Sequence, residues 1–180
     1  MQRAPERVET ARLVLRRPLA TDAEAIFARY ASDPEVTRFL SFPTHRSLAL
    51  THAFLAWSDG EWDRWSAGPY LVEARAGGAL LGSTGFAFES PQRASTGYVL
   101  ARDAWGQGFA TEALRAVVEV ARTKELRRLQ ALCHPEHRPS WRVLEKCGFE
   151  REGILRRYAE LPNFRQGEPV DLLSYARVFP

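Results

Sequence analysis

The sequence predicts an α+β domain: one mixed, mostly antiparallel sheet of about seven strands, with about four helices on its two faces. Three observations support this prediction. The chain has 180 residues, 45% of them hydrophobic, which suits one domain with its own core. Segments with the period of strands and segments with the period of helices follow one another along the chain. No linker, internal repeat or low-complexity tract interrupts them, so residues 1–180 are expected to form a single domain.

The first third of the chain is expected to contain one strand and two helices. The β-favouring run 12–17 ends at Pro18. A helix opens at 21–22, with Thr21 as its cap, and runs through Tyr30 until Asp33-Pro34 breaks it. A longer helix is predicted over 47–65, and Gly68-Pro69 stops it.

The remaining elements alternate in type. Three antiparallel strands are predicted over 70–75, 79–88 and 95–100, the first two joined by a Gly77-Gly78 turn. From Thr111 a helix carries one apolar face, formed by Ala113, Leu114, Val117, Val118 and Ala121. A strand over 129–133, a helix over 140–146 closed by Gly148, and strands over 149–158 and 170–178 complete the fold.

Composition narrows the functional classes. The net charge is +3 and the arginines are scattered, so no nucleic-acid-binding stripe is indicated. No apolar run approaches the roughly 20 residues that span a bilayer, and no signal peptide opens the chain, so a cytoplasmic protein without membrane contact is expected. Cys133 and Cys147 lack zinc or redox spacing and are expected to be buried thiols. His45 and His52 are expected at the surface, and no metal site is predicted.

The segment with the clearest chemistry is 98–113, in which a strand leads through Gly106 and Gly108 into a helix. Such a loop exposes backbone N–H groups at the positive end of a helix, which suits a phosphate or pyrophosphate. Taken alone, the two glycines also fit an ordinary tight turn. The dinucleotide-binding pattern fails because Thr111 stands in the place of its third glycine, and no Gly-Lys-Ser/Thr of a P-loop follows.

Four blocks together are more specific. The segment 105–113 (WGQGFATEA) resembles the coenzyme A pyrophosphate loop of the GNAT superfamily of N-acetyltransferases, and 134–149 (HPEHRPSWRVLEKCGF) resembles a later motif of that superfamily. The segments 9–16 and 32–39 are similar to the branch that contains ribosomal-protein N-terminal (alanine/serine) acetyltransferases, as are 153–156 and the final strand. The similarity covers essentially the whole chain, in the same order.

This resemblance implies a GNAT-like acyl-CoA N-acyltransferase fold, acetyl-coenzyme A as cosubstrate and a primary amine as acceptor. Leu100 would bind the pantetheine arm through its backbone. Trp105, which stands where Gln or Arg is usual, and His137, which replaces an Asn that contacts the coenzyme, would also bind the cofactor. Ser140 is the candidate general acid. The residues implied to hold the pyrophosphate are Gly106, Gln107, Gly108, Phe109, Ala110 and Thr111.

The general base stays unassigned. Many relatives carry a glutamate just before the central Gly-Tyr, where this chain has Ser95 and Thr96. Glu73 and Glu89 are candidates, but each is better explained as a solvated carboxylate. Two further features are ambiguous. Asp171 suits a structural or a substrate-binding role, and tryptophans 57, 62 and 65 suit an acceptor pocket or the core.

Three functions remain open on the sequence alone. The acceptor could be the α-amine of a protein N-terminus, as the branch suggests. It could instead be a small amine such as an antibiotic, a polyamine or an amino-acid derivative. The third possibility is a non-catalytic acyl-CoA-binding module. The oligomeric state, monomer or homodimer, is also open.

Overall fold

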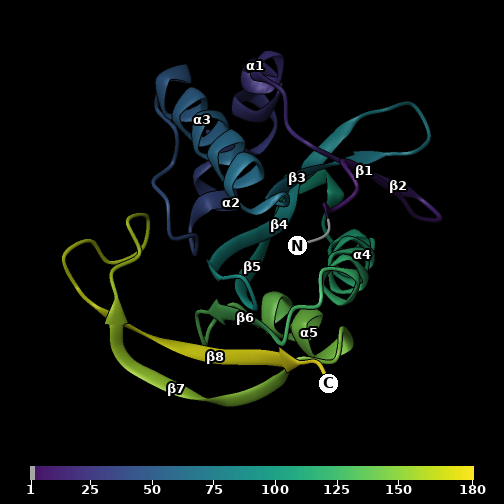
Figure 1. Cartoon of the computed structure of the whole chain (residues 1–180). Coiled ribbons are helices and arrows are strands. Elements are labelled where there is room, and N and C mark those ends of the chain that lie inside the picture. Colours follow the sequence, from purple (N-terminus) through teal and green to yellow (C-terminus); the bar gives the residue numbers. More distant parts are fainter. Residues whose placement is uncertain (1–2) are drawn as a thin grey trace.

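One eight-stranded sheet organises the molecule within residues 3–180, the part of the chain that the computed structural model describes (Figure 1). The strand order is β1-β2-β3-β4-β5-β6-β8-β7, and of these neighbours only β5 and β6 run parallel. The strands are β1 (Arg7–Glu9), β2 (Leu13–Arg16), β3 (Pro69–Ala74), β4 (Leu80–Ser90), β5 (Arg93–Leu100), β6 (Arg128–Cys133), β7 (Glu150–Ala159) and β8 (Val170–Val178). The predicted fold class is confirmed, with one strand more than expected: β1, which is too short to show a period.

Helices cover both faces of the sheet, as predicted. On one side lie α1 (Ala23–Ile26), α2 (Pro34–Thr37) and α3 (Leu48–Trp65), and on the other lie α4 (Phe109–Thr123) and α5 (Arg138–Lys146) (Figure 1). The predicted apolar face of α4 is buried at all five positions. It packs into a core that also contains Trp62, Tyr70 and Phe86. Trp62 is therefore a core residue, whereas Trp57 is 46% exposed.

The first helical segment differs from the prediction. It is a 3-10 turn (Ala20–Asp22), then α1, then a π-helical turn (Phe27–Ala31). Thr21 lies inside the first turn and caps nothing; the buried acid there is Asp22. Its carboxylate accepts the N–H of Leu19 at 2.7 Å and pairs with the Arg16 guanidinium at 2.7 Å. The ion pair between Asp22 and Arg16, a residue of β2, fixes where the helix begins. The sequence around Thr21 does not indicate such a pair.

Asp33-Pro34 ends one helix and also begins another. The Asp33 carboxylate accepts the N–H of Glu35 at 2.9 Å and caps α2, with Pro34 in its first turn. The longer helix α3 starts after Ser47, as expected, and ends at Ser66, whose φ is 55°. α5 begins earlier than predicted, at Arg138, and its N-cap is His137.

The sheet opens between β5 and β6. Their parallel pairing covers only residues 93–95 of β5 and 128–130 of β6, after which the two strands separate. The chain crosses from one strand to the other through α4. The sheet therefore consists of two parts, β1–β5 and β6–β8–β7, that are joined by three residue pairs.

Candidate active site at the opening of the sheet

The glycine loop (residues 105–111) leads into the N-terminus of α4. Gly106 and Gly108 have φ values of 73° and 80°, which non-glycine residues adopt only with strain. Gly108 is the N-cap of α4. Gln107 closes the loop on the preceding turn, because its Nε2 donates to the Asp103 carbonyl at 2.7 Å. Within residues 3–180, the N–H groups of residues 106–111 donate to no acceptor.

The space beside this loop is free. A Cβ built on Gly106 would meet no protein atom within 4 Å, and one on Gly108 would meet only Arg12 Nη2, at 3.5 Å. Six unpaired N–H groups therefore gather at the positive end of a 15-residue helix, next to the open space at Gly106. This arrangement suits a phosphate or pyrophosphate.

An extended ligand can continue from the loop into the opening of the sheet. Just after β5, the Ala101 N–H donates to the Leu81 carbonyl. Because backbone groups alternate in direction along a strand, the odd-numbered residues at this end of β5 bond to β4, and the N–H and C=O groups of the even-numbered residues point toward β6. Tyr98 and Leu100 thus direct backbone groups into the opening. The Leu100 carbonyl already accepts from Trp105 Nε1 at 2.8 Å, which leaves the Leu100 N–H for a ligand. Trp105 is therefore a support for the strand end.

Two hydroxyl groups meet across the opening. Tyr98 Oη donates to the Ser140 carbonyl at 2.6 Å and lies 3.0 Å from Ser140 Oγ. Burial raises the pKa of Tyr98 well above its usual value. Because Tyr98 gives its single proton to the carbonyl, Ser140 Oγ is the donor in the second bond, and Tyr98 Oη accepts from it. Tyr98 thereby orients the Ser140 hydroxyl. Sequence reasoning identified Ser140 but left Tyr98 open between a role in the site and a place in the core.

A cluster of four rings includes His137, the N-cap of α5. Phe39 stacks on His134 and on His137 with 5.0 Å between ring centroids in each case. Phe164 lies 5.1 Å from Phe39 and 4.8 Å from His134. Burial lowers the pKa of both histidines, so both rings are neutral near pH 7. His137 is thus packed against Phe39, and its predicted coenzyme contact stays a prediction.

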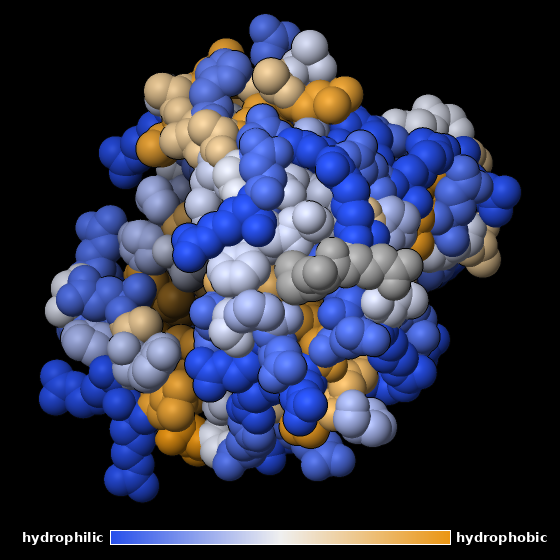
Figure 2. Space-filling view, viewed as in Figure 1, coloured by the Kyte–Doolittle hydropathy of each residue, from blue (hydrophilic) through white to orange (hydrophobic). Residues whose placement is uncertain are grey.

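Asn163 connects the β7–β8 loop to the segment between α2 and α3. Its Oδ1 accepts from the N–H and the hydroxyl of Thr44 at 2.8 and 3.0 Å. Its Nδ2 donates to the carbonyls of Thr37 and Phe42, both at 2.8 Å. Figure 2 shows a recess with a hydrophobic floor between the β7–β8 loop, at the left, and the body of the molecule. These four bonds fix one wall of the recess.

The carboxylates considered as general bases are occupied elsewhere. Glu73 pairs with Arg16 at 2.8 Å, and Glu89 binds Gln130 and Arg93. Asp171 accepts the backbone N–H of Arg157 at 2.8 Å, which supports its structural interpretation.

Two other side-chain predictions have clear outcomes. His45 is buried, with its Nδ1 2.8 Å from Thr51 Oγ1, so its predicted surface position was wrong. Cys133 and Cys147 are buried free thiols, as expected.

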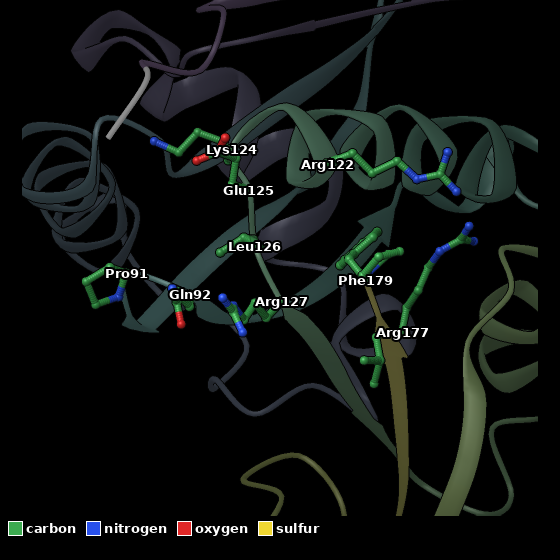
Figure 3. Close-up of a pocket in the computed structure, with 11 residues that line it drawn as sticks. Pro91, Gln92, Arg122, Lys124, Glu125, Leu126, Arg127, Arg177 and Phe179 are labelled. Atoms are coloured by element: carbon green, nitrogen blue, oxygen red, sulfur yellow. The ribbon is translucent and has the colours of Figure 1, made fainter.

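A cavity of about 780 Å³ at the far end of α4 is a poor alternative site (Figure 3). It contains Arg122, Lys124, Arg127 and Arg177, but Figure 3 shows that these side chains point in different directions. It also lies at the negative end of the α4 dipole, about 22 Å from the glycine loop. Within the described residues, no group of three or more His, Cys, Asp or Glu side chains could hold a metal ion. None of the helices in this part of the chain is long and apolar enough to cross a membrane.

Comparison with known proteins identifies the family. The model of the acetyltransferase (GNAT) domain matches residues 12–150. The chain belongs to the GNAT acetyltransferase family. It is 33% identical to the uncharacterized N-acetyltransferase YoaA of Bacillus subtilis (strain 168), with 96% of this chain and 97% of that protein covered. The matched GNAT region includes the glycine loop, Tyr98 and Ser140, and it ends before the Asn163 loop.

Solved structures of GNAT proteins share the whole fold. An acetyltransferase from Bacillus anthracis superposes with a TM-score of 0.82 at 26% identity, covering 96% of this chain and 98% of that one. RimL, a ribosomal L7/L12 alpha-N-protein acetyltransferase solved in complex with coenzyme A, superposes with a TM-score of 0.85 at 23% identity, covering 97% of this chain and 98% of that one. The predicted fold, family and enzyme class are thereby confirmed.

Proposed function

We propose that the protein transfers the acetyl group of acetyl-coenzyme A to a primary amine by direct attack in a ternary complex. The observation that carries this proposal is the glycine loop, in which six unpaired N–H groups gather at the N-terminus of α4, next to open space at Gly106. The RimL structure contains coenzyme A, and its similarity in fold supports this assignment.

The chain offers binding groups for the pyrophosphate and for the pantetheine arm of the coenzyme. The pyrophosphate would be held by the N–H groups of Gly106, Gln107, Gly108, Phe109, Ala110 and Thr111. The Leu100 N–H would bind an amide of the pantetheine arm, and Trp105 would keep the end of β5 in place. His137 would line the coenzyme beside the N-terminus of α5.

Bound acetyl-coenzyme A supplies an activated acyl group. The acceptor amine must be neutral when it attacks, since an ammonium has no lone pair. A C–N bond forms and the C–S bond breaks, and Ser140 Oγ gives its proton to the departing sulfur. Tyr98 holds Ser140 in position. The surplus amine proton passes to water, and a proton from water restores the Ser140 hydroxyl. No protein nucleophile is needed.

For the acceptor we propose the α-amine of a protein N-terminus. The recess beside the β7–β8 loop has a hydrophobic floor and is open to solvent, so it can admit an extended chain end (Figure 2). The RimL name, which specifies a ribosomal α-amine, supports the same choice. A small amine is the second candidate, because the Asn163 contacts hold one wall of the recess in place and so limit how far it can adapt to a peptide.

Thermal unfolding with acetyl-coenzyme A is the first test, with NAD and ATP as controls. At 100 times the dissociation constant, acetyl-coenzyme A should add about 2.7 kcal/mol to the free energy of unfolding. Thiol release should then be measured with peptides that differ only in a free or acetylated N-terminus, and with small amines. No shift at saturation would refute the proposal. Binding without turnover on any amine would identify a non-catalytic module.

A further inference from the structure

We infer that Arg12 is a pyrophosphate-binding residue of the acetyl-coenzyme A site, brought to the glycine loop by the first β-hairpin and oriented by Glu112. The inference rests on the proposed function and adds to it a side-chain ligand from outside the loop. Arg12 lies in the turn between β1 and β2, about 95 residues before the loop in the sequence.

Glu112 fixes this hairpin turn on the first turn of α4. Its Oε1 accepts from the Thr10 hydroxyl at 2.6 Å and from the Arg12 N–H at 2.8 Å. Its Oε2 accepts from Arg12 Nε at 2.7 Å. Burial raises the pKa of Glu112, but the Thr10 and Arg12 donors more than compensate and lower it, so the carboxylate is ionised. The Glu112 side chain is only 18% exposed, which makes this a partly buried ion pair.

The Arg12 guanidinium is held in one orientation. Its Nη1 donates to the Gln107 carbonyl at 3.0 Å, and its Cζ lies 4.5 Å from the centroid of the Phe109 ring. With Nε on Glu112, three contacts fix the plane of the group. The Gln107 carbonyl oxygen is thereby bonded to a cation, which reduces the electrostatic repulsion between this oxygen and an anion bound at the loop.

One nitrogen of this guanidinium has no partner within residues 3–180. Arg12 Nη2 lies 3.5 Å from the position that a Cβ on Gly108 would occupy, next to the N-cap of α4. Both residues line a groove of about 830 Å³ that also includes Thr111 and Arg115. The free Nη2 therefore lies beside the unpaired N–H groups, and it can donate to the same phosphate.

Arg12 also removes an electrostatic conflict. Glu112 places a carboxylate in the first turn of α4, where an incoming phosphate would be repelled. The ion pair with Arg12 neutralises that charge. Two roles, screening Glu112 and donating directly to phosphate, can be separated by experiment, and the inference commits to the second.

The test is calorimetric titration with coenzyme A and with dephospho-coenzyme A, which keeps the pyrophosphate but lacks the 3′-phosphate. Arg12→Gln should weaken both ligands at least about tenfold. Arg12→Lys should bind with intermediate affinity, since it keeps the charge without the fork. Arg7→Gln removes the same charge from β1, where Arg7 contacts Glu9, and should bind like the wild type. Far-UV circular dichroism confirms that each variant is folded.

The double variant Arg12→Gln/Glu112→Gln decides between the two roles. It should stay at least about fivefold weaker than the wild type, because the direct donor is still missing. Recovery of wild-type affinity would overturn the inference and leave Arg12 as a screening charge only. Wild-type affinity in Arg12→Gln would also overturn it, and so would a loss confined to coenzyme A. Failure of the wild type to bind coenzyme A would instead overturn the proposed function, and this inference with it.

Discussion

Replacing Gly106 with alanine separates backbone strain from ligand binding, because the chain offers a matched control. Gly106 and Gly77 have φ values of 73° and 82°, and a Cβ at either position would meet no protein atom within 4 Å. Forcing alanine into this left-handed conformation costs roughly 1–2 kcal/mol at either site. For a domain of this size, each 1 kcal/mol lowers Tm by about 2–4 °C, so both variants should melt about 2–8 °C below the wild type.

Only Gly106→Ala should change coenzyme binding. The volume that its methyl group enters is free of protein, so the group it would displace is the ligand. We expect at least about a tenfold loss of affinity. At a concentration of 100 times the wild-type dissociation constant, the ligand-induced stabilisation should fall from about 2.7 to about 1.4 kcal/mol or less.

Differential scanning fluorimetry with and without acetyl-coenzyme A measures both effects in one experiment. Gly77→Ala should lose stability but keep the full ligand-induced shift. If Gly106→Ala and Gly77→Ala showed the same shift as the wild type, the glycine loop would be a structural turn and the reasoning would be refuted.

Three further predictions follow from the geometry. Ser140→Ala should lower kcat by about 10²-fold or more in a thiol-release assay, with the affinity for acetyl-coenzyme A unchanged. Tyr98→Phe should lower kcat less. An unchanged kcat in Ser140→Ala would show that another group is the proton donor. Gly82→Ala would place a Cβ 2.0 Å from a β5 carbonyl oxygen, so the free energy of unfolding in urea should fall by about 3 kcal/mol, and a wild-type midpoint would contradict this. Burial raises the pKa of Asp22, but Arg16 and a backbone N–H lower it by more, so the folded pKa lies below the unfolded one. The ionised Asp22 therefore stabilises the fold at pH values above the unfolded pKa of about 4, and this stabilisation is lost as the pH falls. Asp22→Asn should therefore destabilise the protein at pH 7 and reduce the pH dependence below pH 4.

Features with a short-range physical cause could be predicted from the sequence. The apolar face of α4 follows from a 3.6-residue period, and the position of the glycine loop follows from two glycines between a strand and a helix. The start of the first helix could not be predicted in the same way. It depends on the pair between Asp22 and Arg16, a residue of β2.

The parts of the site that sequence reasoning missed are made by contacts between distant residues. Tyr98 and Ser140 are 42 positions apart, and Asn163 binds residues more than 115 positions before it. No periodicity or spacing encodes such pairs. The Arg12 contact with Gln107 is of the same kind. His45 shows the converse error, since a polar residue beside a helix start was expected at the surface but is buried against Thr51.

Because β5 and β6 pair over only three residues, the rest of β5 has an unpaired edge although it is an inner strand of the sheet. Tyr98 and Leu100 lie near the middle of the strand order, yet their backbone groups toward β6 lack a strand partner. Unpaired strand edges invite association with other chains, and proteins usually protect them at the rim of a sheet. Here the protection has to come from whatever fills the opening. The amide hydrogens of these two residues should therefore exchange with solvent far faster than those of their neighbours on β4, and a bound ligand that pairs with them should slow that exchange.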